Sequence, residues 1–167
     1  AFKGCLRGVV ALSLLVWSIG SCASCFAQFN TESLSSRSLP TVAEKTAFSA
    51  TATGPQVSEF LALLAEGHAE AKHISIGQTT ERRPLDAIIL AKEPSVVLPL
   101  PENDPRLTVL ILGGIHSGEC DSKEAILALG RDWLADSKKK KELLDSMVFI
   151  LVPNFNADGN ERVGGLH

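Results

Sequence analysis

Residues 107–119 read LTVLILGGIHSGE, and in them an apolar run passes into a glycine-containing turn. The run at 107–112 includes three β-branched residues, which favour strands. An unbroken apolar run of this kind predicts a strand buried on both faces, as in a parallel sheet covered by helices. Gly113 and Gly114 follow directly and allow the backbone to turn sharply and to approach a ligand closely. The stretch therefore predicts a strand that ends in a sharp turn, where the backbone can approach a ligand closely.

His116 and Glu119 lie in this turn, separated by two residues, so that both side chains can converge on one point. Imidazole nitrogen and carboxylate oxygen are common zinc ligands, and catalytic zinc sites often combine two His with one Glu. The turn supplies one of each, so a second His is expected from elsewhere. Taken alone, the pattern also fits a Glu in the first turn of a helix, where the helix dipole favours negative charge.

A second apolar run, Met147 to Val152, predicts another buried strand and precedes the polar segment PNFNADGNER at 153–162. Between the two strands a helix is predicted to begin near Glu119 and to close in the polar segment Asp136 to Glu142. Its expected core residues are Ala125, Ile126, Leu129, Trp133 and Leu134. Strand, helix and strand form a βαβ unit, and parallel strands bring the loops at their carboxyl ends to one edge of the sheet.

The two stretches together resemble the zinc metallocarboxypeptidase family, within the superfamily that also holds succinylglutamate desuccinylase and aspartoacylase-like hydrolases. In that family a glycine-rich strand end carries His-x-x-Glu, and a later strand ends in an Asn-Pro-Asp-Gly-like turn. Here that turn reads NADG at 156–159, and the resemblance covers roughly residues 56–162. Gly118 and Cys120 stand where carboxypeptidase A-like members usually carry Arg and Trp, so a digestive type of substrate preference is not implied.

The resemblance implies zinc-assisted hydrolysis of an amide bond, with His116 and Glu119 as metal ligands and a peptide or acyl-amino-acid substrate. Asn156 and Arg162 become candidates for substrate binding, although Arg162 also reads as an ordinary solvated arginine. The family's second His ligand and general-base Glu are expected beyond residue 167, and His167 is not assigned as a ligand. Two alternatives remain open, a non-catalytic fragment or binding module with an incomplete metal site, and an N-acyl amino acid deacylase.

Composition supports one globular domain and argues against nucleic acid as a partner. The 167 residues are 45% hydrophobic and 21% charged, with a formal net charge of −3 and no basic stripe. The one block of like charge, Lys138 to Lys141, is predicted to be a solvated helix end, where cations suit the dipole.

Residues 1–27 are predicted to be a secretory signal peptide, so the protein is expected to be exported to the periplasm or secreted. Lys3 and Arg7 precede the apolar run 9–19, and small residues follow as far as Ala27. The run is shorter than the 20 or so residues that span a bilayer. A lipid anchor at Cys22 is the alternative, because the residues before it resemble a lipobox. With Cys120 the one cysteine beyond residue 25, no disulfide scaffold is expected.

Residues 28–55 are rich in Ser, Thr and Ala and are predicted to be a disordered linker before a domain at 56–167. A helix is expected from an N-cap at Ser58 to about Gly67. His68 and His73, which follow it, are predicted to be surface or strand-edge residues and not metal ligands.

Residues 74–77 and 85–91 predict two antiparallel strands joined by a polar turn. In that turn, Arg82 and Arg83 are expected to be solvated. Four prolines make residues 92–106 a loop. The predicted fold is α/β, a mixed and largely parallel sheet with flanking helices, truncated so that an apolar edge or face is exposed.

Overall fold

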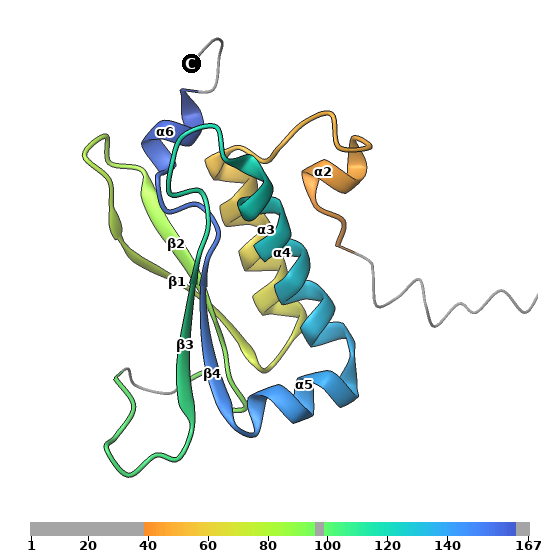
Figure 1. Cartoon of the computed structure of the whole chain (residues 1–167), viewed down its shortest axis with the longest axis vertical. Helices are drawn as coiled ribbons and strands as arrows, with labels where there is room; N and C mark the ends of the chain where they lie inside the picture. Colours follow the sequence, from red (N-terminus) through yellow and green to blue (C-terminus); the bar gives the residue numbers. More distant parts are fainter. Residues whose placement is uncertain (1–38, 96–98, 163–167) are drawn as a thin grey trace, which may run out of the picture. The chain divides into compact units, whose positions relative to one another are not determined.

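The structure is a computed structural model that describes residues 39–95 and 99–162. Helices α3 and α4 lie side by side against one face of a four-stranded sheet (Figure 1). The elements in chain order are α2 (Val42–Lys45), α3 (Gly54–Gly67), β1 (Ala71–Gln78), β2 (Pro84–Leu90), β3 (Leu107–Leu112), α4 (Cys120–Ala135), α5 (Ser137–Leu144), β4 (Met147–Val152) and α6 (Ala157–Glu161). Among these helices none combines the length and apolar character needed to cross a bilayer.

The sheet has the strand order β1-β2-β4-β3 and is mixed, which confirms the α/β prediction. Strands β1 and β2 form the expected antiparallel pair, and β3 and β4 form the expected parallel pair of a βαβ unit. Strand β2 pairs antiparallel with β4. One of the three pairs is therefore parallel, so the described part of the sheet is less parallel than predicted.

Strand β3 is an edge strand of the described sheet, and the prediction that it is buried on both faces is wrong. Leu107 is 65% exposed and Leu110 is 57% exposed. Strand β4, with the same length and a similar composition, lies between β2 and β3, and its Val148, Leu151 and Val152 are fully buried. An exposed apolar edge was expected from the sequence, and it is found at β3.

Helix α3 begins five residues earlier than predicted, after an N-cap at Thr53 instead of Ser58. The Gln56 side chain accepts a hydrogen bond from the Thr53 N–H at 2.9 Å, which satisfies one of the free donors at the helix start. The Ser58 hydroxyl instead donates to the carboxylate of Asp86 on β2. The predicted end at Gly67 is confirmed.

Residues 39–53, which we call the strap, are ordered, so the prediction of a disordered linker is wrong for them. Helix α2 lies in the strap and has a capping box, in which the Thr41 N–H donates to Glu44 at 2.8 Å. Ala43 and Ala52 of the strap are buried. Residues 28–38 of the predicted linker and the predicted signal peptide at 1–27 lie outside the described residues.

The strap is held by a buried carboxylate of α4. Glu124 accepts hydrogen bonds from the N–H groups of Ala43 at 3.2 Å and Ala52 at 2.6 Å, and from the Thr51 hydroxyl at 2.9 Å. A buried charge is stabilised only when its oxygens are hydrogen-bonded, and these three donors meet that need. Of the expected α4 core residues, Ala125 is exposed. The neighbouring Glu124 is buried instead and bonds to the strap.

Arg131 makes a second attachment between α4 and the strap. Its guanidinium pairs with Glu44, with an Nη2–Oε1 distance of 2.9 Å, and donates to the Leu39 carbonyl at 3.1 Å. Burial by itself would favour the neutral form, but the hydrogen bonds to Glu44 and Asp132 raise the pKa of Arg131 well above its usual value.

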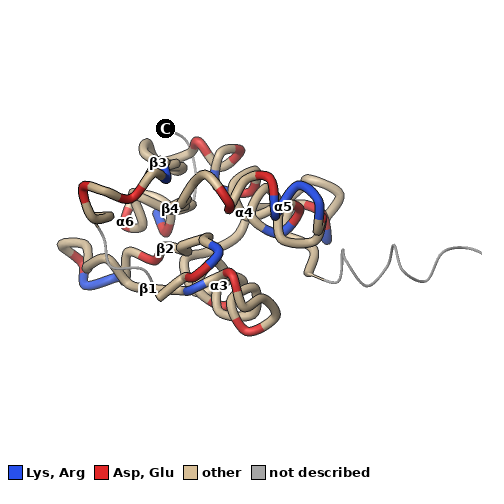
Figure 2. The backbone as a smooth tube through the Cα atoms, turned by 90° about the horizontal axis from the view of Figure 1, so that it is seen from below, with Lys and Arg blue, Asp and Glu red and all other residues tan. Residues whose placement is uncertain are grey.

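The polar segment after α4 is a separate helix, so the prediction that residues 136–142 close α4 is wrong. Asp136 is the N-cap of α5 and accepts from the N–H groups of Lys138 and Lys139, both at 3.0 Å. The lysine run therefore begins in the first turn of a helix, where the dipole disfavours cations, and reaches the last turn at Lys141. Figure 2 shows basic residues along α5. Acidic side chains compensate them, as in the pair of Lys140 with Glu70 at 2.8 Å.

We expect Glu124→Gln to lower the free energy of unfolding at pH 7 by about 1–3 kcal/mol, because a glutamine cannot accept all three bonds. Burial opposes ionisation of Glu124, but the hydrogen bonds from Ala52, Ala43 and Thr51 hold its pKa below the ordinary value. Its stabilisation is thus complete above the unfolded pKa of about 4.3 and is lost as the pH falls through the lower folded pKa.

Urea unfolding at pH 7 and at pH 3 measures this effect. The variant should lose less stability than the parent on acidification. Glu66→Gln, at an exposed position of α3, is the control and should behave as the parent does. Equal stability of the parent and Glu124→Gln at pH 7 would show that Glu124 does not hold the strap.

Candidate active site

The loops that follow β3 and β4 are joined by backbone hydrogen bonds. The parallel ladder continues past the strand ends, where the Gly113 N–H donates to the Val152 carbonyl at 2.9 Å. The Phe155 N–H then donates to the Gly113 carbonyl at 2.9 Å, and the Asn156 N–H to the Gly114 carbonyl at 2.8 Å. The two polar loops lie at one edge of the sheet, as the sequence predicted.

Two glycines make this close approach of the loops feasible. A Cβ atom at Gly113 would lie 2.7 Å from Cδ1 of Ile126 and 3.0 Å from the Pro153 carbonyl oxygen. Gly114 has a φ of +58°, a conformation that residues with side chains adopt at a cost. The expected sharp turn of the backbone is therefore found at Gly114.

His116 and Glu119 lie together at the start of α4, as predicted. Nδ1 of His116 is 3.0 Å from Oε1 of Glu119, and the side chains are 76% and 61% exposed. They line a shallow groove, which is also lined by Lys123, Asn156 and Asn160. An imidazole and a carboxylate placed side by side and open to solvent have the donor chemistry and accessibility of two zinc ligands.

A third protein ligand is not found within residues 39–95 and 99–162, where no group of three or more His, Cys, Asp or Glu side chains could hold a metal ion. His68 is the C-cap of α3, and Nε2 of His73 lies 3.3 Å from Asp86 on β2. Neither histidine lines the groove beside His116.

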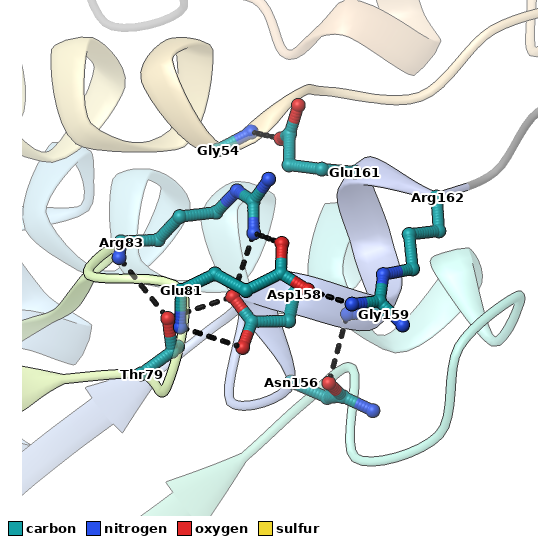
Figure 3. A network of polar contacts seen from close by, with 9 residues as sticks. All are labelled: Gly54, Thr79, Glu81, Arg83, Asn156, Asp158, Gly159, Glu161 and Arg162. Atoms are coloured by element: carbon teal, nitrogen blue, oxygen red, sulfur yellow. Dashed lines mark hydrogen bonds and ion pairs between the residues drawn. The ribbon is translucent and has the colours of Figure 1, made fainter.

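The two candidate substrate-binding residues are in different surroundings. Asn156 lines the groove with His116 and Glu119, and its side-chain oxygen caps α6 by accepting from the Gly159 N–H at 2.9 Å. Arg162 does not line that groove, and its guanidinium pairs with Glu81 in the turn between β1 and β2 (Figure 3). The structure therefore brings Asn156, and not Arg162, to the predicted metal ligands.

Asp158 ties the loop after β4 to the same β1–β2 turn. Its Oδ1 accepts from the Thr79 hydroxyl at 2.7 Å and from the Arg83 guanidinium at 2.7 Å (Figure 3). Burial opposes ionisation, but these hydrogen bonds hold the pKa of Asp158 below its usual value. Arg83 was expected to be solvated in the turn. It instead positions the site loop, and sequence spacing carries no signal for a partner 75 residues away.

Lys123 is the residue of the site that sequence reasoning missed. It is 1% exposed, and its ammonium donates to the Ala52 carbonyl and to the Asn160 side chain. Burial lowers the pKa of Lys123, and the carboxylates of Glu124 and Glu161 partly oppose that shift. Lys123 thus links the strap, α4 and α6 beneath the groove.

Gly159→Ala should destabilise the apposed loops. The new Cβ would lie 2.7 Å from Nδ2 of Asn156 and 2.8 Å from Cβ of Ser117, so the two loops must move apart. Crowding of this kind costs about 1–3 kcal/mol, which urea unfolding would measure. Gly67→Ala is the matched control, because no atom lies within 4 Å of its added Cβ. Equal unfolding free energies for the two variants would contradict the close contact at Gly159.

Comparison with known proteins finds carboxypeptidases among similar sequences and solved structures. The chain is 29% identical to human carboxypeptidase D over 110 residues, which are 64% of this chain and 8% of that protein. A metallo-carboxypeptidase from Burkholderia cenocepacia shares the fold, with a TM-score of 0.52 and 24% identity over 63% of this chain and 27% of that one. Bovine thrombin-activatable fibrinolysis inhibitor, solved with a tick carboxypeptidase inhibitor, gives a TM-score of 0.53 and 22% identity over 65% and 32%.

The chain thus spans less than a third of the length of these relatives. Residues 57–165, well over half of the chain, match the sequence model of the family described as zinc carboxypeptidase. This match includes both site loops and the βαβ unit that carries them. The chain belongs to the zinc carboxypeptidase family.

Proposed function

We propose that this chain carries the amino-terminal part of a zinc-dependent carboxypeptidase-like hydrolase that cleaves a peptide or other amide bond. The observation that carries the proposal is the 3.0 Å approach of His116 Nδ1 to Glu119 Oε1 at the end of a strand. The pair stands within the matched part of the family and beside the loop of Asn156.

His116 and Glu119 are the residues that would hold the zinc. When bound, the metal would polarise the scissile carbonyl and make a water molecule more acidic. The protein's own part is to fix the two metal-binding side chains, since Gly114 turns the backbone ahead of them and Glu119 is the N-cap residue of α4. Asn156 lines the same groove, and this supports its proposed role in substrate binding. Arg162 is the weaker candidate, because a substrate would have to displace Glu81 from it.

We also propose that the protein is exported. Support comes from the basic residues Lys3 and Arg7, followed by the apolar run 9–19 and the small residues that end at Ala27. An extracytoplasmic location suits an enzyme that acts on peptides present outside the cytoplasm.

A second candidate function is a binding module that holds metal weakly. One observation favours it, namely that the described residues offer two neighbouring ligands where catalytic zinc sites normally use three. The two functions predict different outcomes in one series of measurements.

Zinc binding tests the metal site directly. We expect the chain to bind zinc, and His116→Ala and Glu119→Gln to weaken that binding by at least about 10–100-fold, since even changes to residues that only support a ligand have effects of this size. Equilibrium dialysis at neutral pH measures the affinity, and His68→Ala is the control outside the groove. Unchanged affinity in both site variants would remove His116 and Glu119 from the proposal.

Hydrolysis is then followed with zinc present. Because the second His ligand and the general-base Glu are expected beyond residue 167, the assay uses a protein that includes them, and it compares one peptide made with a free and with an amidated carboxyl terminus. A carboxypeptidase should cleave the free form and leave the amidated form intact. Equal cleavage of both forms would contradict carboxypeptidase action and favour an amide hydrolase of the deacylase type. Zinc binding without cleavage of either form would favour the binding module.

A further inference from the structure

A groove of about 620 Å³ lies between the strap and the first half of α4. Its apolar lining comes from four alanines, at positions 43, 50, 125 and 128, and from the ring of Phe48. Cys120 and Asp121, the first two residues of α4, line it as well. In volume the groove is comparable with known ligand sites.

Phe48, which lines the groove, lies in a strained turn. Ala47 and Phe48 have φ values of 50° and 62°, which are costly for residues other than glycine. The turn is fixed by a hydrogen bond of 2.7 Å from the Phe48 N–H to the Ala43 carbonyl. In this turn the aromatic side chain of Phe48 is 80% exposed. Backbone strain of this kind clusters at ligand clamps and other functional segments. Here it presents an apolar ring to a groove, which favours a contact surface.

The groove does not depend on a ligand for its shape. Its strap wall is fixed to α4 by the three hydrogen bonds that Glu124 accepts and by the pair of Arg131 with Glu44. Lys123 adds a bond to the Ala52 carbonyl from below. A preformed wall lowers the entropic cost of binding an extended ligand.

The charges on the groove favour a cationic group. Its charged lining residues are Glu44, Asp121 and Glu124, and no Lys or Arg lines it among the described residues. The first and last of these are bound to Arg131 and to the strap. The side chain of Asp121 is exposed and has neither a hydrogen bond nor an ion pair within the described ranges 39–95 and 99–162. Asp121 is therefore the carboxylate that is available to a ligand.

The groove adjoins the candidate metal site, because Cys120 lines both this groove and the shallow one beside His116 and Glu119. We infer that the groove binds a stretch of the peptide substrate away from the cleaved bond, with an apolar side chain on Phe48 and a basic side chain facing Asp121. This inference rests on the proposed function, since it takes the bound molecule to be the substrate of that site.

Fluorescence anisotropy with labelled octapeptide amides tests the inference on the full chain. One peptide carries two Leu residues and one Arg, and the second has Glu in place of the Arg. We expect the Arg peptide to bind more tightly, Phe48→Ala to weaken its binding by about tenfold through lost apolar contact, and Asp121→Asn to weaken it by about two- to fivefold. The Glu peptide should not be weakened by Asp121→Asn.

Two matched controls lie on α3, where Leu63→Ala removes an exposed apolar side chain and Glu59→Gln an exposed charge. Both should bind the Arg peptide as the parent does, and circular dichroism melting verifies that each variant is folded. Equal affinity of Phe48→Ala and the parent would overturn the inference. Self-association that depends on Phe48, seen by sedimentation without peptide binding, would overturn it in favour of a second copy of the chain.

The amidated peptides separate this inference from the proposed function, because they lack the free carboxylate that carboxypeptidase action needs. Binding that depends on Phe48 and Asp121, without hydrolysis of any free peptide by a protein that includes the expected second His ligand and general-base Glu, supports the groove and contradicts the enzyme. Hydrolysis of free peptides, with binding that is indifferent to Phe48 and Asp121, supports the enzyme and contradicts the groove.

Discussion

The site depends on one backbone contact, the extension of the β3–β4 ladder beyond the ends of both strands. The Gly113 and Gly114 carbonyls accept from the N–H groups of Phe155 and Asn156, and this places the two polar loops side by side. This approach requires a residue without a side chain at position 113, because a Cβ at Gly113 would meet Ile126 and Pro153 at 3.0 Å or less. His116, Glu119 and Asn156 share a groove because the main chain brings their loops together, and not because their side chains attract one another.

A second level of support comes from buried charges on α4. Lys123 and Glu124 are adjacent in sequence, and together they hold the strap through Ala52, whose carbonyl and N–H bond to the two side chains. Lys123 also reaches Asn160 of α6, so that the strap and the loop after β4 are connected through a single ammonium group. Isolated buried charges would be unfavourable, but here each has hydrogen-bond partners, and removal of either would leave the other without part of its compensation.

The comparison of β3 with β4 shows how far the sequence could predict the fold. Both are apolar runs of six residues, and each was correctly predicted to be a strand of a parallel pair. Whether a strand lies at the edge or in the centre of the sheet depends on whether a further strand pairs with its other side. The residues of neither run carry that information. The same holds for the long-range contacts of Arg83 and Glu124, whose partners lie 72 to 81 residues away in the chain. His116 and Glu119 could be predicted because their geometry is set within four consecutive residues.

The candidate metal-binding residues are exposed, and the residues that support them are buried. Substitutions at the first pair are therefore expected to affect metal binding, and substitutions at the second to affect stability. His116 and Glu119 are exposed and bond mainly to each other, whereas Lys123 and Glu124, one turn further along α4, are buried and bonded to distant segments. A change at the first pair removes little that the fold depends on, while a change at the second loosens the strap and α6. The start of α4 and the turn before it thus present two exposed side chains that can coordinate a metal, next to residues that are held by buried contacts. Because both side chains are solvated, their exposure costs little, and a ligand can reach them directly.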